Sequence, residues 1–318
     1  MKIGLHIGKF DWPGSPGNVG EKLAEIARMA DDMGFYSMWV MDHLFQLGTE
    51  FGIIHGPVEA PMLEGYSTIS YLAALTRQIK LGLLVTCPLY RYPGLLVKAI
   101  STIDVLSGGR AYFGVGAGWY EREAEGLGIP FPPTWTERFE RLEETLQIAK
   151  HMWGGDRSPF EGRYYRLEEP INSPQPLYKP HPPILIGGGG EKKTLRLVAE
   201  YGDAWNFVLD SPSPLEEFGV KARTHSREER SEMLRRKLGI LKRHCSDVGR
   251  PYEEVEKTIV TYIKLASGAT DTAEVIELCR ELDGLGFDHV IFNMPNVHEI
   301  ETIEIIGREV IPEVDELA

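Results

Sequence analysis

An acid and an imidazole follow directly on a hydrophobic segment of this chain. The segment YSMWVM, residues 36–41, is rich in aromatic and branched side chains, and Asp42 and His43 come immediately after it. An imidazole titrates near neutral pH, so His43 is a candidate to exchange a proton with a reacting centre. A histidine at a strand end can equally be an ordinary hydrogen-bonded residue. No serine or cysteine elbow accompanies the pair, so nucleophilic catalysis is not indicated.

Glycine-rich segments are the second chemical feature. LIGGGGEKK, residues 185–193, places four glycines between a predicted strand and a predicted helix. Glycines let backbone amides approach a ligand, and a helix start offers unpaired N–H groups to an anion. Four glycines exceed what a tight turn needs, so the segment favours a phosphate site. FGVGAGW, residues 113–119, either contacts a ligand or only permits close packing.

Short apolar runs alternating with helical patterns must position these residues. The runs lie at residues 2–8, 36–41, 80–86, 110–116, 182–188, 203–208, 256–266 and 287–294. Strands that are apolar on both faces and separated by helices predict parallel pairing, and eight such units close into a (β/α)₈ TIM barrel. An open doubly wound sheet is the alternative, but no GxGxxG turn follows the first run. We predict one barrel domain over residues 1–318.

Several local features refine this prediction. Residues 44–65, after strand two, and residues 154–182, before strand five, are expected to be insertions, the second containing a hairpin at PFEGRYYRLEE. Capping pairs predict three helix starts. These pairs are Asn18 with Glu21, Thr134 with Glu137, and Asp271 with Glu274.

The barrel prediction brings the chemical residues together. In such barrels the active site lies at the C-terminal ends of the strands, where a charged side chain meets solvent or ligand instead of the core. This rule gathers residues from all eight strand ends around one mouth. Besides Asp42 and His43, they are His6, Thr86, Cys87, Gly116, Ala117, Gly118, Trp119, Tyr120, Gly187, Gly188, Gly189, Gly190, Asn206, Lys264 and Asn293.

Composition excludes several classes of partner. The net charge of −13 argues against nucleic acid or an anionic membrane surface as the main partner. No apolar stretch approaches the roughly 20 residues that span a bilayer, and the first residues resemble a strand rather than a secretory signal, so a cytoplasmic location is expected. Three separated cysteines indicate reduced thiols, with neither a disulfide framework nor a metal site.

Several segments together resemble the luciferase-like monooxygenase superfamily of flavin and deazaflavin oxidoreductases. The resemblance extends in order over roughly residues 1–210, and the last third is less distinctive. The matching stretches are WVMDHLF, EGYSTISYLAALTRQIKLGLLVT, LSGGRAYFGVGAGW, RFERLEETLQIAKHMW, FEGRYYRL and PHPPILIGGGGEKKTLRLVAEYGDAWN.

The resemblance implies roles for particular residues. It places His43 beside the reactive edge of a flavin-like ring and the coenzyme phosphate on Gly188, Gly189 and Gly190, in agreement with the anion argument. It also implies a cis peptide between Leu84 and Val85 that bulges against the ring. The full set of expected coenzyme-binding residues is His6, Leu84, Val85, Thr86, Gly116, Ala117, Gly118, Gly188, Gly189 and Gly190, with His43 and Asp42 as catalytic residues and Trp119 and Tyr120 at the substrate.

The choice of coenzyme also follows from the resemblance. LLVTCPLYRYPG and GVGAGWYEREAEGLG are more similar to the branch that uses the deazaflavin coenzyme F420 than to the branches that use flavin mononucleotide (FMN). Coenzyme F420 transfers hydride and does not readily activate oxygen, so reduction or dehydrogenation of a small organic molecule is implied. The alternatives are an FMN-dependent monooxygenase with a partner flavin reductase, and a flavin-binding homologue without turnover. A homodimer is expected because relatives are often dimers.

Departures from the family pattern bear on the substrate. The sugar-phosphate dehydrogenase of this family has an acidic residue after its GxG turn and a lysine after strand six, whereas Trp119 stands at the first place and VLDSP, residues 208–212, offers no lysine. A sugar phosphate is therefore not expected. Trp119, Tyr120 and the insertion FGIIHG, residues 51–56, favour a flat, uncharged substrate. An isomerase or aldolase on the same barrel would require a base or a Schiff-base lysine, for which Lys264 is the candidate.

The hypothesis leads to three expectations about single residues. Substitution of His43 should lower turnover more than coenzyme affinity. Asp42 should orient the neighbouring loop or select the tautomer of the imidazole. A bulky residue at Gly189 should weaken coenzyme binding and leave the fold intact, because that position is expected to lie outside the core.

Overall fold

Strands and helices alternate along the chain in the computed structural model, which describes residues 1–51, 55–209, 226–265 and 271–317. The strands of the main sheet are β1 (Lys2–Ile7), β2 (Ser37–Val40), β3 (Lys80–Leu83), β4 (Phe113–Val115), β7 (Ile184–Gly187), β8 (Ala204–Val208), β9 (Glu256–Tyr262) and β10 (His289–Asn293). The α-helices are α1 (Val19–Asp32), α2 (Gly65–Leu75), α3 (Pro93–Ser107), α4 (Glu121–Gly126), α5 (Trp135–Trp153), α6 (Thr194–Tyr201), α7 (Arg227–Asp247), α8 (Thr272–Leu285), α9 (Ile300–Ile305) and α10 (Ile311–Asp315). Short helical turns are η1 (Thr49–Phe51), η3 (Pro88–Tyr90), η5 (Tyr252–Glu254) and η6 (Ile306–Val310).

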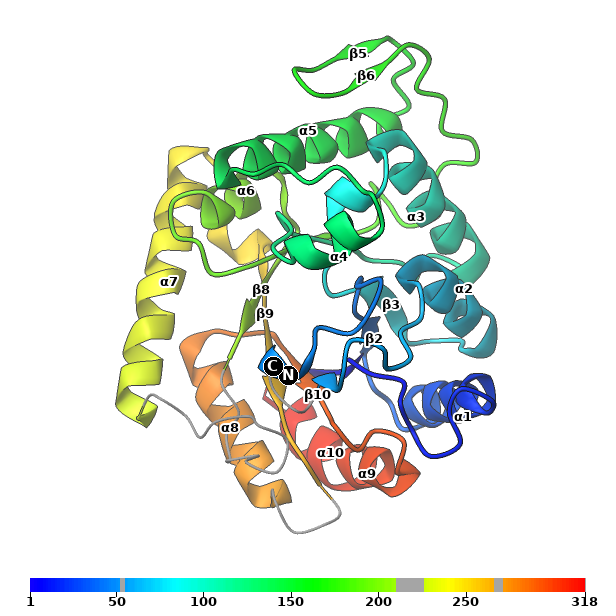
Figure 1. Ribbon diagram of the computed structural model, residues 1–318. Coiled ribbons are helices and arrows are strands. Elements are labelled where there is room, and N and C mark those ends of the chain that lie inside the picture. Colours follow the sequence, from blue (N-terminus) through cyan, green and yellow to red (C-terminus); the bar gives the residue numbers. More distant parts are fainter. Residues whose placement is uncertain (52–54, 210–225, 266–270, 318) are drawn as a thin grey trace.

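The described strands form a nearly closed parallel barrel, as predicted. Their order is β3-β2-β1-β10-β9-β8-β7-β4, and isolated bridges from Leu81 to Ala111 and from Thr86 to Val115 connect β3 with β4. Figure 1 shows the helices surrounding these strands. Each strand segment predicted from an apolar run contains one strand of the barrel. The strands are buried because side chains on one face fill the barrel and those on the other face pack under the helices.

A glycine explains why β3 and β4 come so close together. A Cβ atom at Gly114 would overlap the carbonyl oxygen of Leu83, so no larger residue fits at this contact. Thr86 N–H donates to the Gly114 carbonyl at 2.9 Å, and Gly116 N–H donates to the Thr86 carbonyl at 3.0 Å. These bonds draw the ends of β3 and β4 together at the mouth of the barrel.

Two of the three predicted capping residues cap their helices with a side-chain hydrogen bond, and one does not. Thr134 caps α5 by accepting from Glu137 N–H, and Asp271 caps α8 by accepting from Ala273 N–H. Helix α1 does begin directly after Asn18, as predicted, but the expected side-chain cap is wrong. The Asn18 side chain makes no capping bond to α1 and instead donates to the Pro13 carbonyl at 2.9 Å. The loop before α1 thus competes successfully for the capping side chain.

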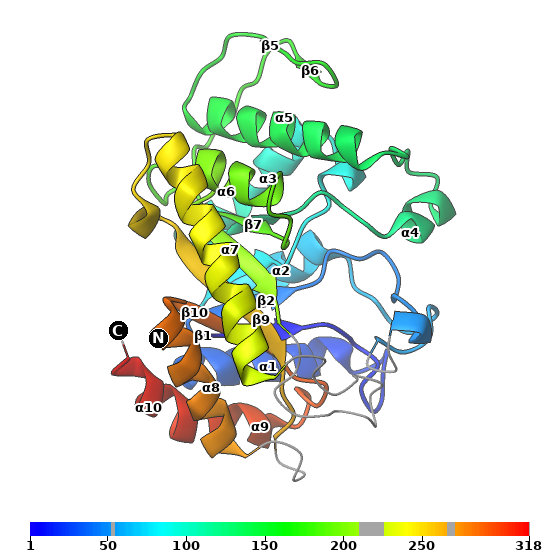
Figure 2. The ribbon, with the colours of Figure 1, turned by 90° about the vertical axis from the view of Figure 1, so that its left-hand side faces the viewer.

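The predicted hairpin before strand five is present. Strand β5 (Phe160–Glu161) pairs antiparallel with β6 (Arg166–Leu167), and both lie beyond α5 at the outside of the barrel (Figures 1 and 2). The bounds of the two insertions, residues 44–65 and 154–182, stay a prediction. None of the described helices is long and apolar enough to cross a membrane.

A buried polar network closes the end of the barrel opposite the mouth. The Glu256 carboxylate accepts from Lys2 Nζ at 2.7 Å and from the Tyr112 hydroxyl at 3.2 Å. His289 Nδ1 lies 3.6 Å from the same carboxylate, and its Nε2 is 2.9 Å from Ser37 Oγ. Glu256 and the side chains around it therefore fill this end of the barrel, and the described cavity lies at the other end.

Candidate active site

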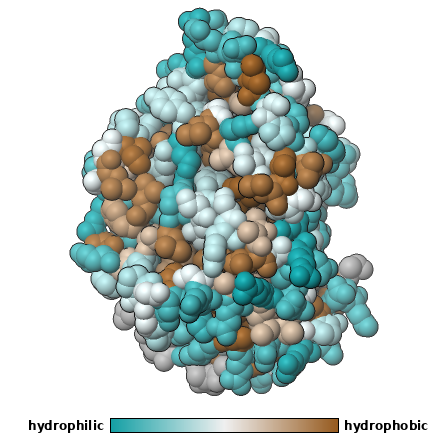
Figure 3. Space-filling model, turned by 90° about the vertical axis from the view of Figure 1, so that its right-hand side faces the viewer, coloured by the Kyte–Doolittle hydropathy of each residue, from teal (hydrophilic) through white to brown (hydrophobic). Residues whose placement is uncertain are grey.

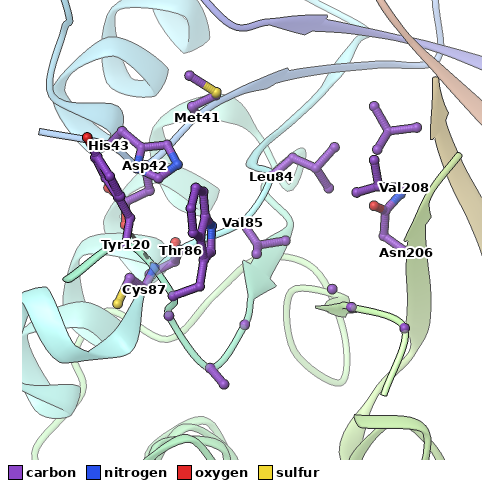
Figure 4. Close-up of a pocket in the computed structure, with 18 of the residues that line it drawn as sticks. Met41, Asp42, His43, Leu84, Val85, Thr86, Cys87, Tyr120, Asn206 and Val208 are labelled. Carbon is purple, nitrogen blue, oxygen red and sulfur yellow. Dashed lines mark hydrogen bonds between the residues drawn. The ribbon is translucent and has the colours of Figure 1, made fainter. Parts of the chain in front are cut away.

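A cavity of about 680 Å³ opens at the C-terminal ends of the strands. All the residues that the sequence analysis assigned to catalysis, coenzyme or substrate line it. Figure 4 shows His43, Asp42 and Tyr120 on one side, Asn206 and Val208 on another, and Leu84 and Val85 between them. Lys264 is not among the lining residues, which removes the support for a Schiff-base aldolase. The volume is within the range of small-molecule sites.

His43 is held by a buried carboxylate that the sequence analysis did not identify. Its Nδ1 is 2.7 Å from Oε1 of Glu123, a fully buried residue of α4. The second oxygen of Glu123 accepts from Leu44 N–H at 2.6 Å, and the Tyr90 hydroxyl also donates to Glu123. The carboxylate oxygen accepts from Nδ1, so Nδ1 carries a hydrogen, and in the neutral form of the ring Nε2 holds the lone pair. Among the described residues, none bonds to that Nε2.

Tyr90 and Cys87 remain protonated in this environment. Burial, then the nearby Cys87 thiol and the Glu123 carboxylate, raise the pKa of Tyr90 well above its usual range, so its hydroxyl serves as a donor. Burial raises the pKa of Cys87 to about 12. A thiol with that pKa is a poor nucleophile, in agreement with the absence of a cysteine-based motif.

Asp42 is engaged by an arginine instead of the imidazole. Arg91 donates to its two oxygens at 2.7 and 2.9 Å and also bonds Glu64, while Cys87 N–H donates to Asp42 at 3.2 Å. Asp42 therefore connects the end of β2 to the segment after β3. The expectation that Asp42 selects the tautomer of His43 is wrong, because Glu123 holds that ring; the expectation that Asp42 orients the neighbouring loop agrees with its bonds. Its assignment as a catalytic residue stays a prediction.

The segment after β3 forms one wall of the cavity. The peptide between Leu84 and Val85 is cis, as expected from the resemblance. The Val85 side chain lies against Gly116 and Gly187, where an added Cβ atom would come within 2.9 Å of it. Thr86 is fully buried and its hydroxyl is 2.7 Å from that of Tyr66. Glycines on β4 and β7 thus leave the room that Val85 occupies.

The glycine-rich loop after β7 lies at the start of α6. Gly188 has a φ of +128°, which only glycine adopts readily, and Thr194 begins the helix with its side chain at the cavity. Lys237 of α7 donates to the Gly189 carbonyl at 2.8 Å. The expectation that a bulky residue at Gly189 spares the packing is wrong, because an added Cβ atom would lie 2.7 Å from the Phe207 ring.

Two other histidines line the cavity in neutral form. Burial, with smaller effects of His55 and His43, lowers the pKa of His6 to about 3. Burial, with His43 and Lys9, lowers the pKa of His55 to about 4. Neither Lys nor Arg belongs to the described lining of the cavity. The described residues contain no group of side chains suited to hold a metal ion.

An aromatic wall borders His43. The Trp119 ring is 5.9 Å and the Tyr120 ring 5.8 Å from the imidazole, both edge-on, and Phe51 is 5.1 Å from Trp119. Trp119 is 45% exposed, whereas Tyr120 is buried and its hydroxyl donates to the Leu47 carbonyl. Trp119 is thus the more available of the two for a substrate. Residues 52–54 of FGIIHG and 210–212 of VLDSP lie outside the described residues.

Sequence reasoning missed Glu123, Tyr90 and Thr194. Glu123 is part of the quoted stretch GVGAGWYEREAEGLG, which contains several glutamates that the sequence alone does not distinguish. Only the folding of this segment into α4 shows that Glu123 is the one that is buried. Tyr90 could have been suspected from its place just after the strand-three segment. Thr194 could have been suspected as the first hydroxyl of the helix after the glycines.

Comparison with known proteins shows which family the chain is similar to. The family model "Luciferase-like monooxygenase" matches residues 1–263. An F420-dependent glucose-6-phosphate dehydrogenase of Microbacterium testaceum is 26% identical over 96% of each chain. A 5,10-methylenetetrahydromethanopterin reductase of Archaeoglobus fulgidus is 33% identical over 63% of this chain and 52% of its own.

A solved structure shares the fold. The coenzyme F420 dependent tetrahydromethanopterin reductase from Methanopyrus kandleri superposes with a TM-score of 0.74 at 18% identity, covering 98% of this chain and 99% of that one. The match of the family model to most of the chain, together with the barrel and the cavity at its mouth, shows that this chain belongs to the luciferase-like monooxygenase family.

Proposed function

We propose that this protein is an oxidoreductase that transfers a hydride between the deazaflavin coenzyme F420 and an uncharged organic substrate. One observation carries the proposal: the same cavity contains the glycine loop that precedes α6 and the imidazole of His43, which the Glu123 carboxylate orients. Relatives that align over nearly the whole chain are F420-dependent dehydrogenases, which favours F420 over FMN.

The residues of the cavity fit such a coenzyme. The loop of Gly188, Gly189 and Gly190 with the start of α6 would hold its phosphate. The N–H groups of Gly189 and Gly190 have no acceptor among the described residues, whereas Gly188 N–H already donates to the Asn206 carbonyl at 3.0 Å. Leu84, Val85 and Thr86, together with Gly116, would border the ring. When bound, the coenzyme supplies the site that accepts or gives the hydride.

His43 would exchange the proton that accompanies the hydride. Its Nε2 lone pair suits acceptance of a proton from a substrate hydroxyl, and the resulting imidazolium would be stabilised by Glu123. In the opposite direction the imidazolium would give this proton back. The group that would exchange the proton, His43, is thus already oriented by Glu123 before a ligand binds.

The lining favours an uncharged, flat substrate. Trp119 and Phe51 present aromatic surface, and among the described lining residues no lysine or arginine is available to pair with a phosphate or carboxylate. We therefore propose a different substrate class from the glucose 6-phosphate named for several relatives. A secondary alcohol or its ketone, with an aromatic or alicyclic group, has the required chemistry.

Binding and turnover assays test the proposal. Purified protein is titrated with F420 and, separately, with FMN, and the change in coenzyme fluorescence gives each Kd. Reduced and oxidised F420 are then offered with ketones, alcohols and glucose 6-phosphate. We expect binding of F420 and turnover of an uncharged pair. Tight binding of FMN without a response to F420 would transfer the proposal to an FMN-dependent oxygenase, and activity with glucose 6-phosphate alone would refute the substrate class.

We also propose that the protein forms a homodimer. Apolar side chains are exposed on α2, α3 and the segment after the β5–β6 hairpin, and Figure 3 shows apolar patches on this side of the molecule. They include Tyr71, Leu95, Leu106, Ile171 and Leu177. Burying such patches between two copies removes apolar surface from water. Sedimentation of the wild type and of Leu95→Glu tests this: the wild type should sediment as a dimer and the variant as a monomer.

A further inference from the structure

His6 carries two buried ring nitrogens that have no partner within the described protein. It lies on β1 and lines the cavity, and only 5% of its surface is exposed. Neither Nδ1 nor Nε2 has a hydrogen-bonding partner. An unpaired buried polar group destabilises a fold, and an apolar side chain would serve better if packing were the only requirement. The ring is therefore placed to bond something that enters the cavity.

The chemistry of His6 restricts what that ligand can be. Burial keeps the imidazole neutral, as its low pKa shows. A neutral imidazole has one N–H donor and one lone-pair acceptor. Its two nitrogens point in different directions, so the one that faces the ligand either donates its N–H to a carbonyl oxygen or accepts from an N–H. A phosphate or carboxylate would be better served by a cation.

The sheet order places His6 across the mouth from the phosphate loop. In the barrel, β1 and β7 are separated by three strands on either side, namely β2, β3 and β4 or β10, β9 and β8. The two strand ends are therefore opposite each other. A ligand whose phosphate is held after β7 and whose ring extends over the cavity would bring one side of that ring to β1.

We propose that His6 binds the pyrimidinedione end of the coenzyme ring. Flavins and 5-deazaflavins share this end, which has two carbonyl groups flanking an N–H. The inference rests on the proposed function in requiring a ring of this type in the cavity, but it does not depend on which of the two coenzymes binds. His6 would thus select the ring, while the glycine loop selects the phosphate.

The experiment separates ring contacts from phosphate contacts. His6→Phe removes both ring nitrogens and keeps a planar side chain; His6→Gln keeps a donor and an acceptor. Thr194→Val, at the start of α6, is the matched change at the phosphate side. Each variant is titrated with the coenzyme that the wild type binds and with the same ring and ribityl chain lacking phosphate, which is riboflavin in the case of FMN. Circular dichroism and Tm report folding, and His6→Leu replaces His6→Phe if that variant does not fold.

We expect His6→Phe to weaken both ligands by the same factor, about 10- to 100-fold. His6→Gln should recover part of this loss, and Thr194→Val should weaken only the ligand that carries phosphate. Wild-type affinity in His6→Phe, or a loss confined to the phosphate-bearing ligand, overturns the role of His6 and leaves the proposed function standing. If the wild type binds neither F420 nor FMN, both proposals are wrong.

Discussion

Glu123 offers the sharpest test of how this site handles a proton, because its carboxylate takes three hydrogen bonds in a fully buried position. In Glu123→Gln one oxygen becomes an NH₂ group. Leu44 N–H can only donate, so the remaining amide oxygen is expected to face it, and the NH₂ group then faces His43 and Tyr90. His43 must accept at Nδ1 to satisfy that donor. Its hydrogen consequently moves to Nε2, and the lone pair toward the cavity is lost.

The expected fall in kcat follows from the loss of the Nε2 lone pair as a proton acceptor. Positioned proton transfer is worth about 10²- to 10⁴-fold in rate, so kcat should fall by about that factor. Coenzyme Kd should change less than about threefold, because Glu123 does not itself line the cavity and is separated from it by His43 and Tyr90. The unfolding free energy should fall by about 1–3 kcal/mol, the usual effect of disturbing hydrogen bonds to a charged group.

The assay combines kinetics with the tautomer itself. Steady-state kcat and KM are measured with the best substrate pair, and ¹⁵N NMR reads which nitrogen of His43 carries the hydrogen. Glu121→Gln is the matched control, since Glu121 starts the same helix with an exposed side chain 3.9 Å from Arg138, and it should behave as wild type. Unchanged kcat together with an unchanged Nδ1–H tautomer in Glu123→Gln would refute the reasoning.

Three further predictions concern other parts of the molecule. His43→Ala should lower kcat by about 10²- to 10⁴-fold with little change in coenzyme Kd; weakened binding at normal turnover would make His43 only a wall of the cavity. Gly189→Val should weaken coenzyme binding and also lower Tm, because its side chain would displace Phe207; an unchanged Tm would contradict the observed contact. Although burial opposes ionisation, His289 and Lys2 lower the pKa of Glu256 to about 2. Ionised Glu256 should therefore contribute about 3 kcal/mol to the free energy of unfolding above pH 4.5, and this contribution should vanish as the pH falls toward 2. Denaturant unfolding at several pH values should show that the free energy of unfolding falls less steeply with decreasing pH in Glu256→Gln than in the wild type.

The strands and the mouth of the barrel could be predicted from the sequence because they depend on local patterns. Runs such as KIGLHIG are apolar on both faces, which only a strand covered on both sides can satisfy. The consecutive glycines at residues 187–190 indicate backbone approach wherever they are placed. Once a barrel is assumed, the strand-end rule brings His6, His43 and the glycines to one cavity, and the structure places them there.

Pairings between side chains were decided only by the tertiary structure. Asn18 had the right type and position to cap α1, yet it bonds the preceding loop, because its competing partner is set by how that loop folds back. Likewise, Asp42 adjoins His43 in the sequence, but successive side chains at a strand end point in different directions. Asp42 therefore meets Arg91, and His43 meets a carboxylate 80 residues away.

The same distinction applies to the candidate site as a whole. The sequence determined which kinds of groups surround the mouth: an imidazole, an acid, glycines and aromatic rings. The closed barrel decided which of them are already satisfied and which are left for a ligand. Asp42 is satisfied by Arg91, whereas His6 keeps two unpaired nitrogens. The physical reason is that a hydrogen bond depends on distances of about 3 Å between loops from different strands, and these distances exist only after the strands have come together.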